Sequence, residues 1–259
     1  MAYQNLISEL KENILYVTIN REKALNALNK DTLAELADII AYAGKTDQVR
    51  GVILTGSGEK AFVAGADIKE FSDYSGKQGE DLSKLGHDQV FNAIENSSKP
   101  FVAAINGFAL GGGLELAMAC HMRVASDHAK LGLPEVTLGL IPGYGGTQRL
   151  TQLVGKGKAI EMITTANMVT ASLAEKIGLV NYVVPQPDLI SKAEEILNLV
   201  KQRAPLAVSA AIKAVNAAVN NKNGYLTEIE EFGKCFETAD FKEGAAAFVE
   251  KRKPNFVGK

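Results

Sequence analysis

The sequence contains little of the material that disulfide-bonded or metal-binding proteins use. Among its 259 residues are two cysteines and three histidines. The cysteines, Cys120 and Cys235, are 115 positions apart, which excludes a disulfide-dense secreted scaffold and fits a reducing compartment. Lys and Arg number 28 against 30 Asp and Glu, a net charge of −2. We therefore expect no metal site and no overall basic field that would attract nucleic acid or a membrane.

Targeting and membrane-spanning patterns are also missing. Residues 1–5 show neither the basic region nor the apolar core of a signal peptide. No uninterrupted apolar run reaches the roughly 18–20 residues that a membrane-spanning helix needs. These absences favour a cytoplasmic protein.

Glycine, by contrast, is in excess and unevenly placed. The chain has 24 glycines, about 9% of its residues against a usual ~7%. Eleven of them lie between Gly107 and Gly157. This clustering needs a structural or functional explanation.

The apolar pattern predicts strands that alternate with helices. Residues 6–10 and 14–19 form a β-hairpin around a polar turn. Asn29 is a helix N-cap before an apolar stripe that ends near Gly44. Further strands are expected at 52–55, 101–105, 122–125 and 179–184, and further helices at 82–96 and 114–120. This alternation predicts an α/β fold with right-handed crossovers.

After residue 184 the pattern becomes helical. Helices are expected at 189–202, 205–220, 225–239 and 242–251. A boundary near residue 200 divides the chain into an α/β body, residues 1–200, and a helical region, residues 201–259. The stretch 69–90 is rich in small and polar residues and is expected to form a mobile loop that shapes a pocket.

The densest glycine segment runs from an apolar strand through Gly111, Gly112 and Gly113 into a helix. At a helix N-terminus bare backbone lets a ligand approach, and the first N–H groups lie unpaired at the positive end of the helix dipole. Such amides can hold a developing negative charge. A tight turn against a neighbouring element explains the three glycines equally well.

Neither glycine cluster fits a nucleotide-binding motif. The 107–113 segment has the spacing G-x-x-x-G-G-G instead of G-x-G-x-x-G. The second cluster, 143–148, has Gln148 where the last glycine would belong, and it follows Ile141-Pro142 rather than a strand. No G-x-x-x-x-G-K-[ST] sequence occurs, so nucleotide binding is not supported.

Two glutamates lie in apolar surroundings close to these clusters. Glu115 is on the first turn of the helix after the three glycines, and Glu135 follows Pro134 in an apolar loop. A carboxyl in such surroundings has a raised pKa, and two carboxyls in different environments can divide acid and base roles. The ordinary alternatives are a solvated side chain or, for Glu115, a complement to the helix dipole.

Together these motifs resemble the enoyl-CoA hydratase (crotonase) family over nearly the whole chain. The matching stretches are NREKALNAL (20–28), AFVAGADI (61–68), NGFALGGGLELAMAC (106–120), PEVTLGLIPG (134–143), GGTQRL (145–150) and AFVEKR (247–252). The resemblance implies a crotonase-like spiral of ββα units followed by a helical C-terminal region for trimerisation. It also implies a homo-oligomer, commonly a hexamer built as a dimer of trimers.

The resemblance further implies roles for particular residues. The N–H groups of Ala64 and Gly112 form an oxyanion hole for the thioester oxygen of an acyl-CoA. Glu115 mainly activates a water that adds at Cβ of a 2-trans-enoyl thioester, and Glu135 delivers a proton to Cα. Residues implied in substrate or CoA binding are Lys23, Ala24, Leu25, Ala66, Asp67, Ile68 and Gly143, with Phe248 and Lys251 lent across the subunit interface. Coenzyme A is part of the substrate, so no separate cofactor is implied.

Other functions compete with reversible hydration. A 3-enoyl-CoA to 2-enoyl-CoA isomerase of the same family needs only one base, and many such relatives lack one of the two glutamates. Some relatives bind RNA or act as scaffolds, but the basic cluster Lys251-Arg252-Lys253 is too short to indicate nucleic-acid binding, and Lys251 is equally well explained as a solvated side chain. The hydrolase motifs G-x-S-x-G and H-E-x-x-H are absent. The hydratase is the function that we expect, with the isomerase as the alternative.

Overall fold

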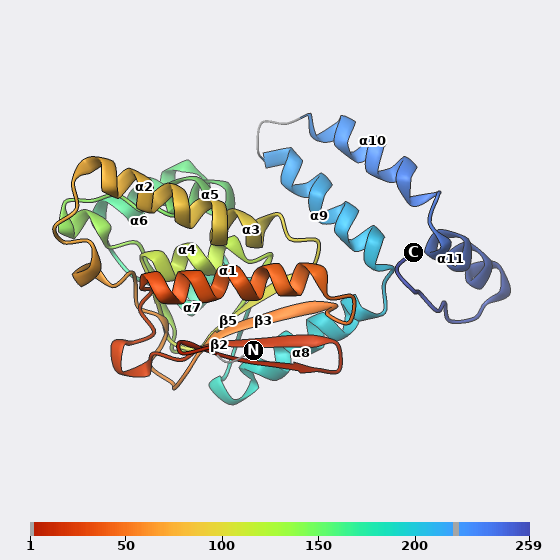
Figure 1. Ribbon diagram of the computed structural model, residues 1–259, viewed down its shortest axis with the longest axis horizontal. Helices are drawn as coiled ribbons and strands as arrows, with labels where there is room; N and C mark the ends of the chain where they lie inside the picture. The colour runs from red at the N-terminus through yellow and green to blue at the C-terminus, as the bar shows by residue number, and fades with distance from the viewer. Residues whose placement is uncertain (1–2, 220–222) are drawn as a thin grey trace.

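A computed structural model of the chain describes residues 3–219 and 223–259, which include two β-sheets; β2, β3 and β5 of the larger sheet are labelled in Figure 1. The larger sheet has the strand order β1-β2-β3-β5-β7-β10. Its strands are β1 (Leu6–Lys11), β2 (Ile14–Ile19), β3 (Gly51–Gly56), β5 (Phe101–Ile105), β7 (Met122–Ser126) and β10 (Tyr182–Val184). The β1–β2 pair is antiparallel and the other pairs are parallel. The predicted α/β fold is confirmed, although the strand predicted at 179–184 is confirmed only for its second half.

The smaller sheet has the strand order β4-β6-β8-β9. Its strands are β4 (Ala61–Val63), β6 (Phe108–Leu110), β8 (Lys130–Gly132) and β9 (Val169–Thr170). The apolar pattern does not predict this sheet, because strands of two or three residues are too short to show a period. Since β3, β5 and β7 are each followed by a strand of the smaller sheet, the chain winds between the two sheets in repeated turns, as expected for a spiral of ββα units.

The N-terminal hairpin agrees with the sequence except at its turn. Lys11 is the last residue of β1 and pairs with Ile14, so the turn contains only Glu12 and Asn13. Their φ values, 49° and 67°, are left-handed. Two-residue turns of this kind match the twist of the strands that they join.

Helix α1 (Lys30–Lys45) begins as predicted and ends later than predicted. The side chain of Asn29 caps it by accepting the Thr32 N–H at 2.9 Å. Gly44 does not stop the helix but lies in its last turn, with no neighbouring atom within 4 Å of an added Cβ. A glycine there lowers helix stability, but the backbone remains helical because glycine also adopts helical φ and ψ.

The prediction of a loop over 69–90 is wrong from Gly76 onward. Helix α2 (Gly76–Gly86) follows Ser75, which forms a capping box with Gln78: Ser75 Oγ accepts the Gln78 N–H and Gln78 Oε1 accepts the Ser75 N–H. The chain continues through a π-helical segment (His87–Phe91) into α3 (Asn92–Glu95). The helix predicted at 82–96 is therefore confirmed, with an earlier start and a π-helical interruption.

The two faces of the larger sheet are covered by different elements (Figure 1). On one face lies α8 (Leu189–Lys201), whose Leu189 and Leu197 join Val102 in a buried cluster. The opposite face packs against α1 and α4 (Gly112–Ala119) in the larger cluster. All residues of α4 are buried, so packing on every side fixes the helix that follows the three glycines.

Three helices between β8 and β10 are not predicted by the apolar pattern. They are α5 (Gly146–Val154), α6 (Lys156–Thr165) and α7 (Ala171–Lys176). Of these, α5 begins in the second glycine cluster and packs against α4. It thereby brings the two glycine clusters together.

The C-terminal helices project from this body (Figure 1). They are α9 (Pro205–Val219), α10 (Gly224–Cys235) and α11 (Ala239–Glu250), and the predicted boundary between residues 200 and 201 lies at the last residue of α8. The last position of the helix predicted at 205–220 lies outside the described residues. The helices predicted at 225–239 and 242–251 are shifted, since α10 ends at Cys235 and the side chain of Thr238 caps α11 by accepting the Phe241 N–H.

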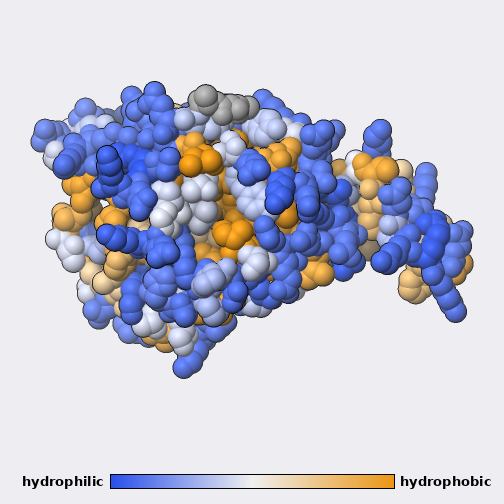
Figure 2. Space-filling model, turned by 90° about the horizontal axis from the view of Figure 1, so that it is seen from below, coloured by the Kyte–Doolittle hydropathy of each residue, from blue (hydrophilic) through white to orange (hydrophobic). Residues whose placement is uncertain are grey.

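The projecting helices expose large apolar side chains. Figure 2 shows apolar surface on this part of the molecule. The most exposed large apolar side chains of these helices are Val215, Tyr225, Ile229, Phe232, Phe248 and Val249. Such a surface is typical of a protein–protein interaction site.

No helix among residues 3–219 and 223–259 is long and apolar enough to cross a membrane.

Candidate active site

Each glycine of the 111–113 segment has its own structural reason. Gly111 ends the turn between β6 and α4 with a φ of 51°, a conformation that favours glycine. A Cβ on Gly113 would lie 2.0 Å from the Val63 carbonyl oxygen, so this glycine allows α4 to pack on β4. Gly112 is the first residue of α4, and a Cβ there would meet only ordinary contacts at 3.6 Å or more. The tight turn and the accessible amide are thus both present, at different glycines.

Two backbone N–H groups remain without a partner beside this turn. The Gly112 N–H opens α4, where the first donors have no acceptor within the helix. The Ala66 nitrogen lies 3.6 Å from the position that a Cβ on Gly112 would take. Among the hydrogen bonds of the described residues, none uses either group as a donor. The two amides are free to bind one acceptor between them.

The assignment of Ala64 to an oxyanion hole does not agree with the structure. The Ala64 N–H donates to the Leu25 carbonyl oxygen at 3.0 Å. This bond joins the segment after β4 to the turn that contains Leu25, and it leaves Ala64 no donor to offer. Ala66, assigned from the sequence only to CoA binding, provides the free amide instead.

Glu115 is buried and held by the second glycine cluster. Only 1% of the residue is exposed. Its Oε1 accepts the N–H groups of Tyr144 and Gly146, each at 2.7 Å. The pKa of Glu115 is raised to about 7, mainly by burial and also by nearby Glu135, although the two N–H donors and Arg149 lower it. This carboxyl can therefore gain or lose a proton near neutral pH.

Glu135 faces the same space with a free oxygen. It begins a short 3-10 helix (Glu135–Leu138) after Pro134. Its Oε2 is buried without a hydrogen-bond partner among the described residues, and its Oε1 lies 2.9 Å from the position of a Cβ on Gly111. Burial raises the pKa of Glu135, as expected for a carboxyl in apolar surroundings.

These groups line one cavity of about 720 Å³. It brings together seven residues predicted from the sequence: Ala64, Ala66, Ile68, Gly112, Glu115, Glu135 and Gly143. Three elements supply them, namely the segment after β4, the start of α4 and the turns after β8. The cavity is thus the place where the glycine clusters and the two glutamates meet.

The other predicted residues lie outside the cavity wall. Lys23 and Ala24 belong to an exposed 3-10 turn (Glu22–Ala24) next to Leu25. Asp67 pairs with Arg21 at 3.1 Å, which ties this turn to the segment after β4. Arg21 was not predicted, although it lies within a matching motif.

Phe248 and Lys251 lie far from the cavity within one chain. Both are on or just after α11, at the end of the molecule opposite α2 (Figure 1). Phe248 is 86% exposed. Their contribution across a subunit interface therefore stays a prediction.

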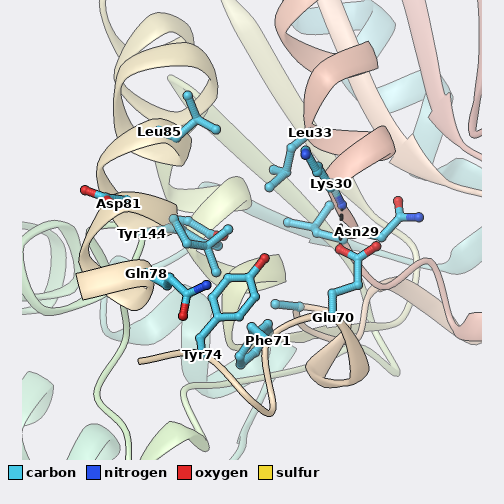
Figure 3. A pocket seen from close by; sticks show the side chains of 13 residues that line it. Asn29, Lys30, Leu33, Glu70, Phe71, Tyr74, Gln78, Asp81, Leu85 and Tyr144 are labelled. Carbon is cyan, nitrogen blue, oxygen red and sulfur yellow. Dashed lines mark hydrogen bonds between the residues drawn. The ribbon is translucent and has the colours of Figure 1, made fainter. Parts of the chain in front are cut away.

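A second cavity of about 250 Å³ adjoins the first and lies between α1 and α2 (Figure 3). Its apolar wall includes Leu33, Leu82 and Leu85. The two cavities share Ala66, Phe71, Tyr74, Leu82 and Tyr144. The ring of Tyr144 stacks on Phe91 with 4.6 Å between centroids, and a Cβ on Gly86 would lie 2.3 Å from it. A tightly packed aromatic ring thus stands where the cavities meet.

Sequence patterns did not identify Tyr144 as a site residue. The available signal was an aromatic residue flanked by Gly143 and Gly145, since glycines leave room around a ring. Its hydroxyl makes no hydrogen bond within the part of the chain that the structure describes. Tyr144 therefore contributes its ring to the cavities and its backbone N–H to Glu115.

Comparison with known proteins agrees with these motifs. The sequence profile described as "Enoyl-CoA hydratase/isomerase" matches residues 9–259. The chain is 46% identical to a crotonyl-CoA hydratase of Syntrophomonas wolfei over 100% of both chains. It is 48% identical to a short-chain-enoyl-CoA hydratase of Clostridium acetobutylicum over 98% of this chain and 97% of that protein. The crystal structure of an enoyl-CoA hydratase from Bacillus anthracis superposes with a TM-score of 0.93 at 39% identity, covering 99% of this chain and 100% of that one.

Proposed function

The chain belongs to the enoyl-CoA hydratase/isomerase family and has the crotonase fold, and on that premise we propose that it is an enzyme that adds water reversibly to a 2-trans-enoyl-CoA to give a 3-hydroxyacyl-CoA. One observation carries the proposal: one buried and one half-buried carboxyl, with two unpaired backbone amides, surround one cavity. Hydration needs a base for water, an acid for Cα and a site for charge on the thioester oxygen. The cavity holds a group for each task.

The two amides serve the thioester oxygen. As the water oxygen bonds to Cβ, electrons move through the conjugated system and negative charge develops on that oxygen. The N–H groups of Ala66 and Gly112 donate to it, and the N-terminal end of α4 adds partial positive charge. Removing one such donor typically lowers kcat by about 10²–10³-fold, so this pair supports a large part of the rate.

The different surroundings of the carboxyls divide their roles. Glu115 accepts two N–H bonds, which partly oppose the rise in its pKa and hold the carboxylate in place, so it takes a proton from the water as the oxygen bonds to Cβ. Glu135 has a buried oxygen without a donor, which favours its protonated form, so it gives a proton to Cα. The product carries OH on Cβ and H on Cα, and solvent restores both carboxyls after release. The same steps in reverse dehydrate the product.

The test is hydration of crotonyl-CoA by the purified protein, followed as the loss of the conjugated enoyl absorbance. The result expected is turnover that depends on both glutamates. A parallel assay of double-bond migration in a 3-enoyl-CoA distinguishes the isomerase, which needs one base and gives the second carboxyl no task. Negligible hydration together with fast migration would replace the proposal by the isomerase.

The CoA portion of the substrate is bound at the surface beside the cavity. Lys23, Ala24 and Leu25, together with Asp67, form this rim, and the Arg21–Asp67 pair holds it in place. Coenzyme A enters and leaves as part of the substrate, and the proposed steps use carboxyls, amides and water, so the proposal includes no separate cofactor.

The proposal also includes a homo-oligomer, a trimer or a dimer of trimers. The apolar side chains of α9, α10 and α11 support it, because a partner subunit would cover them. In such an assembly Phe248 and Lys251 of one subunit would reach the CoA site of another, where Lys251 would pair with a CoA phosphate. Analytical ultracentrifugation should give a mass of three or six chains, and a monomeric mass would contradict this part of the proposal.

Tyr144 is expected to limit the length of the acyl chain. Replacing it with alanine removes the ring that stands between the two cavities and opens the leucine-lined space beyond it. Each methylene that enters gains about 0.8 kcal/mol, so the ratio of kcat/KM for a C8 enoyl-CoA to that for a C4 enoyl-CoA should rise about 10-fold or more. Tyr144→Phe keeps the ring and should keep the wild-type ratio. An unchanged ratio in Tyr144→Ala would contradict the limit.

A further inference from the structure

Arg149, on α5, is buried and firmly held although it does not line the cavity. The residue is 5% exposed. Its guanidinium makes a bidentate pair with Glu95 of α3, through Nη2–Oε2 at 2.9 Å and Nε–Oε1 at 3.3 Å. Nη2 also donates to Asn92 Oδ1 at 2.9 Å. The planar guanidinium is therefore fixed in one orientation by α3.

The third nitrogen of the Arg149 guanidinium donates to the turn that binds Glu115. Its Nη1 donates to the Tyr144 carbonyl oxygen at 2.9 Å. The N–H groups of Tyr144 and Gly146, in the same turn, donate to Glu115 Oε1. Arg149 thus binds the turn by a carbonyl oxygen, and Glu115 binds it by two amides.

Two glycines let the charged groups come this close. Gly145 has a φ of 99°, and a Cβ on it would lie 2.2 Å from Arg149 Nη1. A Cβ on Gly146 would lie 2.9 Å from Glu115 Oε1. Any side chain at either position would displace the guanidinium or the carboxyl. The turn is therefore shaped to hold both groups.

We propose that Arg149 is a positioning residue of the hydration reaction: through the Tyr144 carbonyl it holds the 144–146 turn so that its two amides keep the Glu115 carboxyl aimed into the cavity. This inference rests on the proposed function. The competing interpretation is an ion pair that only joins α3 to α5. The two differ in what happens to Glu115 when the pair is lost.

The charge of Arg149 also acts on Glu115. The ionisable groups around this carboxyl are Glu135, Arg149 and Tyr144, with His87 next to Gly145, its Cε1 3.2 Å from an added Cβ. Of these, Arg149 lowers the pKa of Glu115 and Glu135 raises it. Loss of the guanidinium should therefore shift the protonation of Glu115 to higher pH.

Arg149→Met and Arg149→Lys test the proposal, with Arg123→Met as the matched control. Arg123 is equally buried, at 5% exposed, and donates to the carbonyl oxygens of Leu179, Ala117 and Cys120, at the other end of α4. We expect Arg149→Met to lower kcat at least 10-fold with KM within about 3-fold of wild type, and to move the acidic limb of the kcat profile to higher pH. Arg149→Lys keeps the charge without the fork, so its limb should stay near the wild-type pH with kcat partly recovered.

Each variant is first compared with Arg123→Met for melting temperature and far-UV circular dichroism. If Arg149→Met does not fold, Arg149→Lys and Glu95→Gln are used instead, because each perturbs the Arg149–Glu95 pair without removing the cation. A kcat in these variants like that of the control, or an acidic limb in Arg149→Met at the pH of the control, would overturn the proposal. If wild-type protein does not hydrate crotonyl-CoA, the proposed function fails. The Arg149 inference is then judged from the Glu115 carboxyl titrated by NMR, which should still show a higher pKa in Arg149→Met.

Discussion

Replacing Glu115 with glutamine is expected to lower kcat for hydration of crotonyl-CoA by about 10²–10⁴-fold, the range that a placed acid or base contributes. Glutamine keeps the shape, and its Oε1 can still accept the N–H groups of Tyr144 and Gly146. It cannot take a proton from water. Steady-state kinetics of the purified variant, with a circular dichroism spectrum to show folding, measure the loss.

Asp240→Asn is the matched control for this substitution. Asp240 is also 1% exposed and accepts two backbone N–H groups, from Val257 at 2.7 Å and Gly258 at 2.9 Å. It lies on α11, away from the cavity within the chain. The kcat of Asp240→Asn should stay within a few-fold of the wild-type value. Near-normal turnover in Glu115→Gln, or an equal loss in both variants, would contradict the role of Glu115.

Glu115→Gln should also stabilise the protein at pH 8. Burial raises the pKa of Glu115 from 4.5 to about 7 on folding, so the folded protein binds this proton more tightly than the unfolded chain does. The contribution of this group to stability is full below about pH 4.5, falls as the pH rises toward 7, and stays reduced above it. In urea unfolding, the free energy of unfolding of Glu115→Gln should therefore exceed that of wild type slightly at pH 5 and by at most about 3 kcal/mol at pH 8. An equal gain at both pH values would contradict the raised pKa.

Glu135→Gln is expected to lower kcat by about 10²-fold or more, because glutamine cannot deliver a proton to Cα. Its KM should change little, since the side chain acts on reacting atoms rather than on CoA. The double variant, Glu115→Gln with Glu135→Gln, should be no more than a few-fold slower than the slower single variant, because groups that act as a unit are not additive. Losses that multiply would indicate two independent tasks, and normal turnover in Glu135→Gln would refute its role.

Local patterns predicted the elements whose signal lies in neighbouring residues. The hairpin of β1 and β2 follows from its alternation, and the start of α1 follows from Asn29. The strands of the smaller sheet were not predicted because each is two or three residues long. The start of α2 was not predicted because residues 76–79 have no apolar stripe, although Ser75 and Gln78 have the spacing of a capping box.

The site was predictable where chemistry follows residue type and not where it depends on distant contacts. Glu115 and Glu135 are identified by a carboxyl among apolar residues next to glycine. The choice of Ala66 over Ala64 as the free amide depends on the Leu25 carbonyl, which lies nearly 40 positions earlier in the chain and occupies the Ala64 N–H. Likewise, the orientation of the Arg149 guanidinium depends on its ion pair with Glu95 of another helix. No local pattern contains that information.

The donors assigned to the thioester oxygen belong to the main chain, which changes how mutation can damage them. Every amino acid except proline carries this N–H, so substitution at Ala66 or Gly112 leaves the donor itself in place. One residue further on, a Cβ at Gly113 would stand 2.0 Å from the Val63 carbonyl oxygen. Any side chain there would push α4 away from β4 and carry the Gly112 amide with it. In a library of random variants, inactive proteins should therefore carry replacements of Gly113, the neighbour that performs no chemistry, at least as often as replacements of Gly112.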